Sequence, residues 1–291
     1  MTLRIATRAS RLARWQAERV GALLGGDVEY VLVTTTGDRD QTSDLHSIGG
    51  QGVFTKEVQG AVLEGRADVA VHSAKDLPSE TPVGLTLAAI PERADARDAL
   101  VGSTLAALPD RATIGSGSVR RRAQLAAARP DLQFGPLRGN IETRLRKREE
   151  MGYDAVVVAY AALERLELGA EATELLEPNV VMPQVGQGAL AVECRSDDGA
   201  TLALLRAIDN ANAHQAVEAE RAFLAELGGG CDLPCGAFAR VRSDGIEIEA
   251  VLASLDGAVI VRRRAHGTKA LDVGQAIARD VLDAFPGEAA S

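Results

Sequence analysis

The chain has 291 residues, of which 46% are hydrophobic and 25% are charged, and its formal net charge is −9. This composition is ordinary for a globular protein, and a chain of this length is expected to form two domains with room for a small third. The acidic excess disfavours general binding of polyanions, and an aromatic content of 3% leaves few rings for stacking on bases. We therefore expect no nucleic-acid partner.

No segment has the features of a membrane span or an export signal. The N-terminal residues MTLRIATRAS contain no apolar core, and no run of 18 apolar residues occurs. These features predict a soluble, cytoplasmic protein without a membrane partner. In that reducing compartment the three cysteines are expected to be free thiols.

Strands and helices are predicted to alternate through the first 93 residues. A helix is expected from Ser10, which can cap it, to Gly25, which can end it. The other patterns predict strands at LRIAT, VEYVLVTTT, ADVAVHSAKDLP and LTLAAIP, a helix at VFTKEVQGAVLEG, and a polar, glycine-rich loop over 37–52. This alternation is typical of a parallel sheet covered by helices.

The alternation begins again at residue 112 and changes character near residue 211. Strand-to-helix units are predicted at ATIGSGSVRRRAQLAAARP and LQFGPLRGNIETRLRKREEMG, followed by the apolar segment DAVVVAYAAL, a strand at GALAVECR and one long helix over 201–227. Two strands joined at Asp256-Gly257 and a closing helix over 269–285 complete the pattern. The predicted fold class is α/β, with two doubly wound lobes and a third, smaller α+β domain.

The segment 111–150 is strongly basic, with ten Lys or Arg residues against four Asp or Glu residues. Within it, GSGSVRRR joins a predicted strand to a predicted helix, where unpaired backbone N–H groups and the helix dipole favour an anion. Ser116 and Ser118 add hydroxyl groups, and Arg120 and Arg121 add guanidinium groups suited to carboxylates or phosphates. The alternative is a capped helix whose arginines are solvated.

Two further strand-to-helix junctions carry the same chemistry. LRGNIETR contains Arg138 and Arg144, and ATRASR contains Arg8, Ser10 and Arg11. Because ligands of open α/β sheets bind at the carboxyl ends of the strands, the three junctions together favour a site for an anionic ligand.

Lys75 and Asp76 follow an apolar strand in HSAKDLPSE. They are either an ion pair in a surface turn or part of a cleft lined by arginines. In such a cleft a lone carboxylate can stabilise a cationic intermediate and move a proton. His72, within an alternating strand pattern, is interpreted as structural.

Cys231 and Cys235 lie on the glycine-rich segment LGGGCDLPCG. One C-x3-C pair supplies too few ligands for a typical structural zinc site, and a redox pair prefers C-x-x-C spacing, so no metal is predicted. Two interpretations stay open from the local pattern. The cysteines are either small residues in a turn, or one of them is a thiol on a flexible loop that forms a covalent bond.

Taken together, these motifs resemble those of the hydroxymethylbilane synthase family, also called porphobilinogen deaminase. The matching stretches lie in order between residues 4 and about 237, and they are RIATRASRLARWQ, TTGD, GGQGVFTKE, DVAVHSAKDLP, IGSGSVRRRAQL, LRGNIETRL, YDAVVVAYAALERL, PQVGQGALAVECR and GGCDLPCGA. Each is weak alone, but the combination is highly specific. The chain departs from the family pattern at Gln51, where lysine is usual, so we assign this residue no ionic role.

The resemblance implies a transferase of tetrapyrrole and heme biosynthesis. It would join four porphobilinogen molecules head to tail, release an ammonia from each, and free hydroxymethylbilane by hydrolysis. A dipyrromethane cofactor would be held by a thioether to Cys231, with no role for Cys235, and Asp76 would be the catalytic carboxylate. The cofactor would be bound by Lys75, Ser116, Ser118, Arg120, Arg121, Arg138 and Arg144, and the substrate by Arg8, Ser10, Arg144 and Arg165.

The resemblance also implies a monomer with two periplasmic-binding-protein-like lobes. We expect the first lobe to comprise residues 1–93 plus 189–206, the second 94–188, and the domain that carries the cysteine loop 211–291. The rival interpretation is a two-lobed solute-binding module that closes on an anionic small molecule. The missing export signal, the lysine–aspartate pair and the cysteine loop disfavour it. A cytosolic effector-sensing domain is disfavoured too, because no helix-turn-helix region accompanies it.

Overall fold

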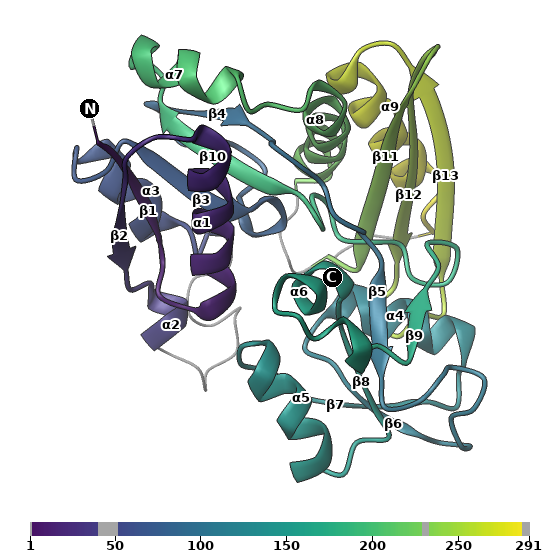
Figure 1. The fold of residues 1–291 in the computed structure, drawn as a ribbon. Helices are drawn as coiled ribbons and strands as arrows, with labels where there is room; N and C mark the ends of the chain where they lie inside the picture. The colour runs from purple at the N-terminus through teal and green to yellow at the C-terminus, as the bar shows by residue number, and fades with distance from the viewer. Residues whose placement is uncertain (1, 40–51, 229–232, 287–291) are drawn as a thin grey trace.

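The computed structural model describes residues 2–39, 52–228 and 233–286, which form three sheets with helices packed around them (Figure 1). The first sheet lies at the upper left of the figure, the second at the bottom and the third at the upper right. This arrangement agrees with the predicted fold class of two α/β lobes and a third, smaller unit.

The first sheet combines strands from two distant parts of the chain. Its elements and the helices around it are β1 (Leu3–Arg8), α1 (Arg11–Leu24), β2 (Val28–Val33), α2 (Thr36–Arg39), α3 (Lys56–Leu63), β3 (Val69–Ser73), the 3₁₀ helix η1 (Ala74–Asp76), β4 (Leu85–Ala89), β10 (Leu190–Arg195) and α7 (Gly199–Arg206). The strand order is β2-β1-β3-β10-β4. β1 is parallel to β2 and β3, whereas β10 is antiparallel to both of its neighbours.

Helix α1 begins and ends where the sequence predicts. The Ser10 hydroxyl accepts a backbone N–H of the first turn at 3.3 Å, and Gly25 ends the helix with a φ of +68°. The buried face of the helix, with Ala17 and Val20, packs in one apolar cluster with Ile5 of the sheet. This packing holds the N-terminus of α1 at the carboxyl end of β1.

The second sheet is also mixed. Its elements are β5 (Asp98–Val101), β6 (Thr113–Gly115), α4 (Val119–Ala128), β7 (Gln133–Gly135), α5 (Ile141–Glu150), β8 (Ala155–Ala159), α6 (Tyr160–Arg165), the 3₁₀ helix η2 (Gly169–Glu171) and β9 (Glu174–Leu176). The order is β7-β6-β8-β5-β9, with β6 parallel to β7 and β8 and β5 antiparallel to β8 and β9.

The prediction of parallel sheets is therefore wrong at β5 and β10. The chain enters each of these strands directly after it passes from the other sheet. Neighbouring parallel strands are normally joined by a helical crossover, and none precedes β5 or β10. Strands β5 and β9, which are short, were not predicted.

The third sheet is an antiparallel meander packed on two helices. Its elements are α8 (Ala211–Glu226), β11 (Cys235–Arg242), β12 (Gly245–Ala253), β13 (Ile260–Gly267) and α9 (Ala270–Asp283). Phe223, Ile248 and Ile277 are buried at its centre. The predicted turn at Asp256-Gly257 is confirmed, and Gly257 has a φ of +74°. Strand β11 was not predicted.

The single long helix expected over 201–227 is wrong, because the chain bends between α7 and α8. The Asn210 side chain accepts the Ala213 N–H at 3.0 Å and caps α8. The Asp209 carboxylate accepts the Ile90 N–H at 2.7 Å, and the Asn210 N–H donates to the Ile90 carbonyl at 3.1 Å. Local polar contacts of this kind compete with helix continuation and here attach the bend to the end of β4.

Glu220 of α8 connects the third unit to the two segments in which the chain passes between the lobes, one between β4 and β5 and the other between β9 and β10. It is fully buried, and its carboxylate accepts from Arg93 at 2.6 and 3.1 Å, from the Gly186 N–H at 2.7 Å and from the Ala239 N–H at 2.8 Å. Each oxygen is thus satisfied by contacts from different parts of the fold.

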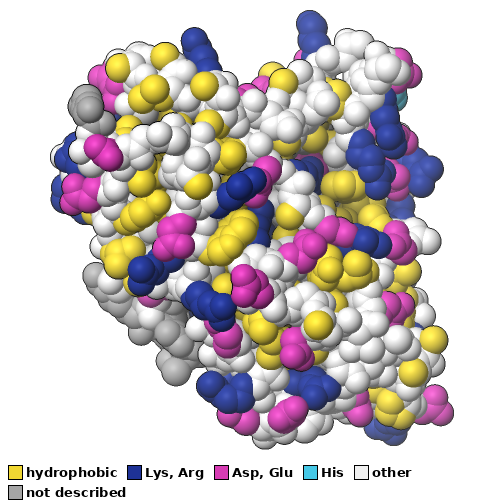
Figure 2. Space-filling view, viewed as in Figure 1, with side chains coloured by type: hydrophobic (Ala, Val, Ile, Leu, Met, Phe, Trp, Pro, Cys, Tyr) yellow, Lys and Arg dark blue, Asp and Glu magenta, His cyan; other side chains and the backbone are white. Residues whose placement is uncertain are grey.

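The surface shows no single acidic region on the face seen in Figure 2. Lys and Arg side chains mix with Asp and Glu side chains over this face, and a notch separates the first lobe from the third unit at the top. No helix within the described residues is long and apolar enough to span a membrane.

Candidate active site

A cavity that is partly open to solvent is lined by residues of the first two sheets and their helices. Among the described residues that line it, Asp76 is the only acid, whereas Arg8, Lys75 and Arg165 are basic. The remaining lining residues are Ser10, Leu12, Ala13, Gln16, Ser73, Ala159, Ala161, Ala162 and Gly188. The cavity therefore presents several cations and one carboxylate to a ligand.

Lys75 and Asp76 reach the cavity because β3 ends in the single turn of η1. Gly186 lies against this turn with a φ of +72°, and a Cβ there would come within 2.9 Å of the backbone of η1. Lys75 Nζ donates to Gln187 Oε1 at 3.3 Å. Burial, reinforced by nearby arginines, lowers the pKa of Lys75 to about 8. Lys75 and Asp76 are both half-buried, unlike an ion pair on an open surface turn.

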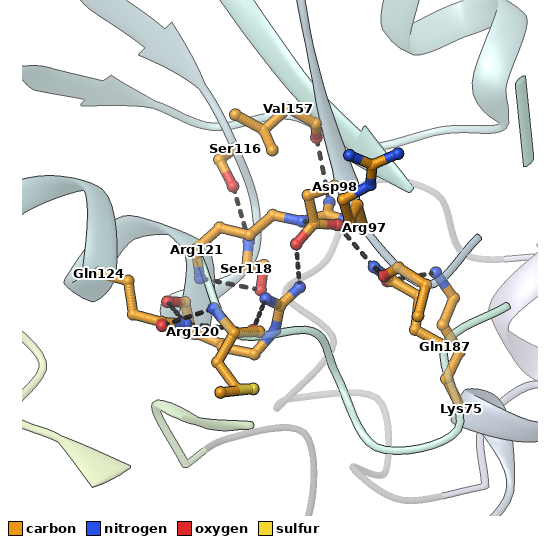
Figure 3. Close-up of polar contacts among 12 residues, drawn as sticks. Lys75, Arg97, Asp98, Ser116, Ser118, Arg120, Arg121, Gln124, Val157 and Gln187 are labelled. Atoms are coloured by element: carbon orange, nitrogen blue, oxygen red, sulfur yellow. Dashed lines mark hydrogen bonds and ion pairs between the residues drawn. The ribbon is translucent and has the colours of Figure 1, made fainter. Parts of the chain in front are cut away.

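A buried cluster around Asp98 lies beside Lys75 (Figure 3). Asp98 accepts from Arg120 Nη2 at 2.7 Å, from Arg121 Nη2 and Nε at 2.7 and 3.1 Å, and from Gln187 Nε2 at 2.8 Å. Burial alone would raise the pKa of Asp98, but the two guanidinium groups outweigh it and hold that pKa far below its ordinary range. Gln187 joins this cluster to Lys75.

Arg120 and Arg121 are only 3% and 6% exposed, so the alternative of solvated arginines is wrong. Arg120 Nη1 also donates to the Met182 carbonyl, and Arg121 Nη1 donates to the Val157 carbonyl at 3.0 Å. Most of their donors therefore have protein acceptors. A ligand carboxylate that reached these arginines would share them with Asp98.

The turn from β6 into α4 is held by Ser116 and Ser118. The Ser118 hydroxyl accepts the Arg121 N–H at 3.4 Å and caps α4, and the Ser116 hydroxyl accepts the Ser118 N–H at 3.3 Å. A Cβ at Gly117 would lie 2.8 Å from the Leu137 carbonyl oxygen. This close approach brings the β6–α4 turn against the segment that carries Arg138.

Arg138 and Arg144 come from the junction of β7 and α5. Arg144 Nε donates to the Gly139 carbonyl at 2.8 Å, while Arg138 Nη1 is buried and has no acceptor within the described residues. Burial and the charges of Arg121 and Arg138 lower the pKa of Arg144 to about 10, whereas the charge of Asp76 acts to raise it. A buried donor without an acceptor, among guanidinium groups that repel one another, fits an anionic ligand.

Arg8 is already paired with a carboxylate. Its Nε lies 3.2 Å from each oxygen of Asp38, its Nη2 donates to the same group, and the guanidinium lies 4.3 Å from the centroid of the Phe54 ring. The neighbouring Ser10 hydroxyl caps α1. Both residues line the cavity, as a substrate-binding role requires.

Arg165, at the end of α6, also lines the cavity. Its Nη2 donates to the Gly188 carbonyl at 2.6 Å, and its Nε is buried without an acceptor among the residues described. Burial lowers its pKa to about 10, so it is a cation at neutral pH.

Two residues singled out in the sequence, Cys231 and Gln51, lie outside the described residues. Cys235 is buried at the start of β11. Cys194 is buried in β10, and burial raises its pKa to about 11. Within the described part of the chain, no three His, Cys, Asp or Glu residues are placed to hold a metal ion.

Comparison with known proteins gives matches to two family models. The model described as "Porphobilinogen deaminase, dipyromethane cofactor binding domain" matches residues 3–203, and "Porphobilinogen deaminase, C-terminal domain" matches residues 214–283. The chain belongs to the porphobilinogen deaminase family. The resemblance drawn from its motifs is confirmed.

Relatives named Porphobilinogen deaminase include that of Acidothermus cellulolyticus, which is 46% identical over 294 residues, covering 97% of this chain and 89% of the relative. The relative from Roseiflexus sp. is 47% identical over 291 residues and covers 97% and 96%. Among solved structures, the second substrate binding domain of a putative amino acid ABC transporter from Streptococcus pneumoniae has a TM-score of 0.45 at 11% identity, covering 72% of this chain and 92% of that one. The Bordetella pertussis BvgS VFT2 domain has a TM-score of 0.42 at 14% identity, covering 76% and 91%.

Three buried polar residues in or beside the cavity were not predicted as candidate site residues. Asp98 lies in RADARDALV, where neighbouring charges suggest a surface, and only the apolar residues after it indicate a buried strand. Gln187 was quoted within a family motif but given no role. Gln16, 4% exposed and lining the cavity, follows the helical spacing of α1, which indicates a buried face without indicating a ligand.

Proposed function

We propose that this member of the porphobilinogen deaminase family joins four porphobilinogen molecules head to tail, releases one ammonia from each and hydrolyses the product to hydroxymethylbilane. The observation that carries the proposal is one carboxylate, Asp76, lining a cavity with Arg8, Lys75 and Arg165. Porphobilinogen has an acetate, a propionate and an aminomethyl group. The cations are suited to its carboxylates, and Asp76 is suited to its amine.

Asp76 would act at the carbon–nitrogen bond of the substrate. The bond breaks as the amine leaves with a proton as ammonia, and the ionised Asp76 stabilises the positive charge that remains on the pyrrole ring and its methylene carbon. The proton that leaves with the ammonia comes from Asp76, which is thereby ionised. When the new carbon–carbon bond has formed, the proton lost from the attacking pyrrole carbon passes to Asp76 and restores it. One carboxylate thus serves both halves of the step.

We also propose that Cys231 holds a dipyrromethane cofactor by a thioether. The cofactor-binding family model covers residues 3–203, and the buried, unpartnered Nη1 of Arg138 beside Arg144 fits its carboxylates. When bound, the group supplies the pyrrole end from which the chain grows. The residues proposed to bind it are Lys75, Ser116, Ser118, Arg120, Arg121, Arg138 and Arg144, and those proposed to bind substrate are Arg8, Ser10, Arg144 and Arg165.

We propose that the protein acts as a cytoplasmic monomer without a nucleic-acid or membrane partner. Its units would be residues 1–93 plus 189–206, residues 94–188 and residues 211–291. The pairing of β10 with β3 and β4 supports the return of the chain to the first lobe.

Ammonia release from porphobilinogen by the purified protein tests the reaction. Asp76→Asn keeps the shape and removes the charge, so we expect activity to fall by about 10²–10⁴-fold with the fold intact. Asp131→Asn, which removes a half-buried carboxylate that does not line the cavity, is the matched control. Binding of porphobilinogen without ammonia release would favour the solute-binding alternative instead.

The mass of the intact protein tests the anchor. The wild type should be heavier than its sequence by two linked pyrrole units, and Cys231→Ser should not. Cys235→Ser is the control and should keep the added mass. An unmodified wild type that is fully active would falsify covalent anchoring, and loss of the mass in Cys235→Ser alone would identify the other thiol.

A further inference from the structure

Arg165 has one guanidinium nitrogen bound to the backbone and another that is buried without an acceptor in the described part of the chain. Its Nη2 donates to the Gly188 carbonyl at 2.6 Å, while its buried Nε has no acceptor within the described residues. The side chain is 6% exposed and lines the cavity. A carboxylate in the cavity would satisfy the Nε–H, so the direction of this donor matters for binding.

The ring of Trp15 lies against this guanidinium. Arg165 Cζ is 5.5 Å from the ring centroid, within the range of a cation–π contact. Trp15 is half-buried and is not among the residues that line the cavity. It therefore contacts the arginine without being placed to contact the ligand.

Trp15 belongs to the face of α1 that meets the second lobe. Leu12, three residues earlier, packs on the apolar cluster of the second sheet, and Arg11 Nη2 donates to the Leu166 carbonyl at 3.4 Å. The contact between α1 and α6 is thus a seam between the lobes (Figure 1). The ring reaches Arg165 across this seam.

Other acceptors compete for Arg165. The charges of Glu92 and Glu164 both act on its pKa, so both carboxylates lie within electrostatic range. Glu92 is paired with Arg19 of α1 at 3.0 Å, and Glu164 is exposed. A guanidinium free to turn would be attracted toward these carboxylates.

We propose that Trp15 is a positioning residue for substrate binding, which holds the Arg165 guanidinium so that its Nε–H points to a substrate carboxylate. The inference rests on the proposed function and deepens it. Helix α1 of the first lobe would thus help to orient Arg165 of the second lobe. Because the two residues come from different lobes, the contact forms only when the lobes are together.

The test compares Trp15→Leu and Trp15→Phe in preparations that carry the same added mass. Loss of the ring in Trp15→Leu should raise the KM for porphobilinogen by about 5- to 30-fold, with kcat changed less. Trp15→Phe keeps a ring and should stay within about threefold of the wild type. Trp15→Met, which keeps bulk without a ring, replaces Trp15→Leu if that variant does not fold.

A matched control lies in the second lobe, where Arg122 Cζ is 5.9 Å from the centroid of the Phe134 ring and neither residue lines the cavity. Phe134→Leu should leave the KM unchanged. An equal rise in KM for Phe134→Leu would mean that loss of packing, and not the placement of Arg165, explains the result.

Fluorescence separates this inference from the proposed function. Trp15 is the only tryptophan of the chain, so its emission should change when porphobilinogen is added to the wild type and not when it is added to Arg165→Leu. Turnover that is insensitive to Trp15→Leu would overturn the inference alone. If porphobilinogen is not turned over but changes the Trp15 emission of the wild type and not of Arg165→Leu, the proposed reaction is overturned and the inference is kept. If there is neither turnover nor a change in emission, the proposed reaction and the inference are both overturned.

Discussion

The Asp98 cluster and the Arg138–Arg144 region contain the same side chain in opposite situations. In the first, two buried guanidinium groups share a carboxylate that the protein supplies. In the second, Arg138 Nη1 is buried without an acceptor among the described residues, as Arg120 Nε of the first region also is, but no described carboxylate forms an ion pair with Arg138 or Arg144. The Asp98 carboxylate thus compensates the charge in one region, whereas no described carboxylate is paired with the arginines of the other.

The difference shows why arginines in one basic segment need different explanations. A buried arginine paired with its own carboxylate contributes to the fold, and removing either partner leaves an uncompensated buried charge. A buried arginine without an acceptor costs stability until a ligand arrives, which makes it a better candidate for binding. The following changes test that division, from the largest expected effect to the smallest.

Removing the charge of Asp98 should have the largest effect. Asp98→Asn leaves Arg120 and Arg121 buried without a counter-ion, so we expect a loss of about 3–5 kcal/mol in the free energy of unfolding. Urea denaturation measures it. Asp131→Asn, which breaks the far more exposed pair with Arg129, should change stability much less. Equal effects in the two variants would contradict the assignment of the Asp98 cluster to the fold.

The fold and the chemical nature of the site could be predicted from the sequence. Which arginines are paired with a carboxylate of the protein could not. Alternation of strands and helices gave the two lobes, and Ser10 and Gly25 marked α1 correctly, because these signals are local. Asp98 could not be identified as the partner of Arg120, since the two are 22 residues apart and meet only when β5 pairs with β8. The antiparallel direction of β5 and β10 was not predicted for the same reason, because it follows from the crossings between the lobes.

Replacing an arginine of the second region should affect binding more than folding. Arg138→Leu and Arg144→Leu should each cost about 1.5–3 kcal/mol of ligand binding, the worth of a charge-assisted hydrogen bond. An arginine that holds the anchored pair should give folded protein without the added mass. One that holds later rings should keep that mass and stall elongation, with partly extended chains in the mass spectrum. Higher salt should weaken substrate use in the wild type as well.

These variants also carry a clear contrary outcome. If Arg138→Leu and Arg144→Leu fold, carry the added mass and turn over porphobilinogen normally, the region does not serve the ligand. Arg146→Leu, at the exposed pair with Glu150 on the same helix, is the control and should change neither property.

Lys75 lies between the two regions and should make substrate use depend on pH. Its pKa is lowered from 10.5 to about 8, so it loses its charge above about pH 8. We expect kcat/KM to fall there by about three- to tenfold, less than for loss of an arginine, because Arg165, whose pKa is about 10, still carries its charge at pH 8. Lys75→Arg should keep the positive charge and remove the fall in kcat/KM above about pH 8. If kcat/KM of this variant still falls there, the fall is due to the titration of another group.

The same shift predicts how Lys75 affects stability. Below about pH 8 the lysine is protonated in both the folded and the unfolded chain, and the fold bears the full cost of a buried cation. Between about pH 8 and the ordinary value of 10.5 the unfolded chain binds the proton more, so the contribution of Lys75 to stability should improve as pH rises. Denaturation of the wild type and Lys75→Met across this range measures the difference, which should shrink as the pH approaches 10.5.

Arg8 should give the smallest effect, because it combines features of both regions. It has a protein carboxylate, Asp38, as the Asp98 cluster does, but the two side chains are 23% and 24% exposed and line or adjoin the cavity. An ion pair exposed to water exchanges partners at little cost, so a substrate carboxylate can take the place of Asp38. Asp38→Asn keeps the shape and removes the competing charge, and it should lower the KM for porphobilinogen by up to about fivefold without changing kcat. A higher KM in steady-state kinetics would mean that Asp38 orients Arg8 for the substrate, and Arg8 would then belong with the arginines whose charge the fold itself compensates.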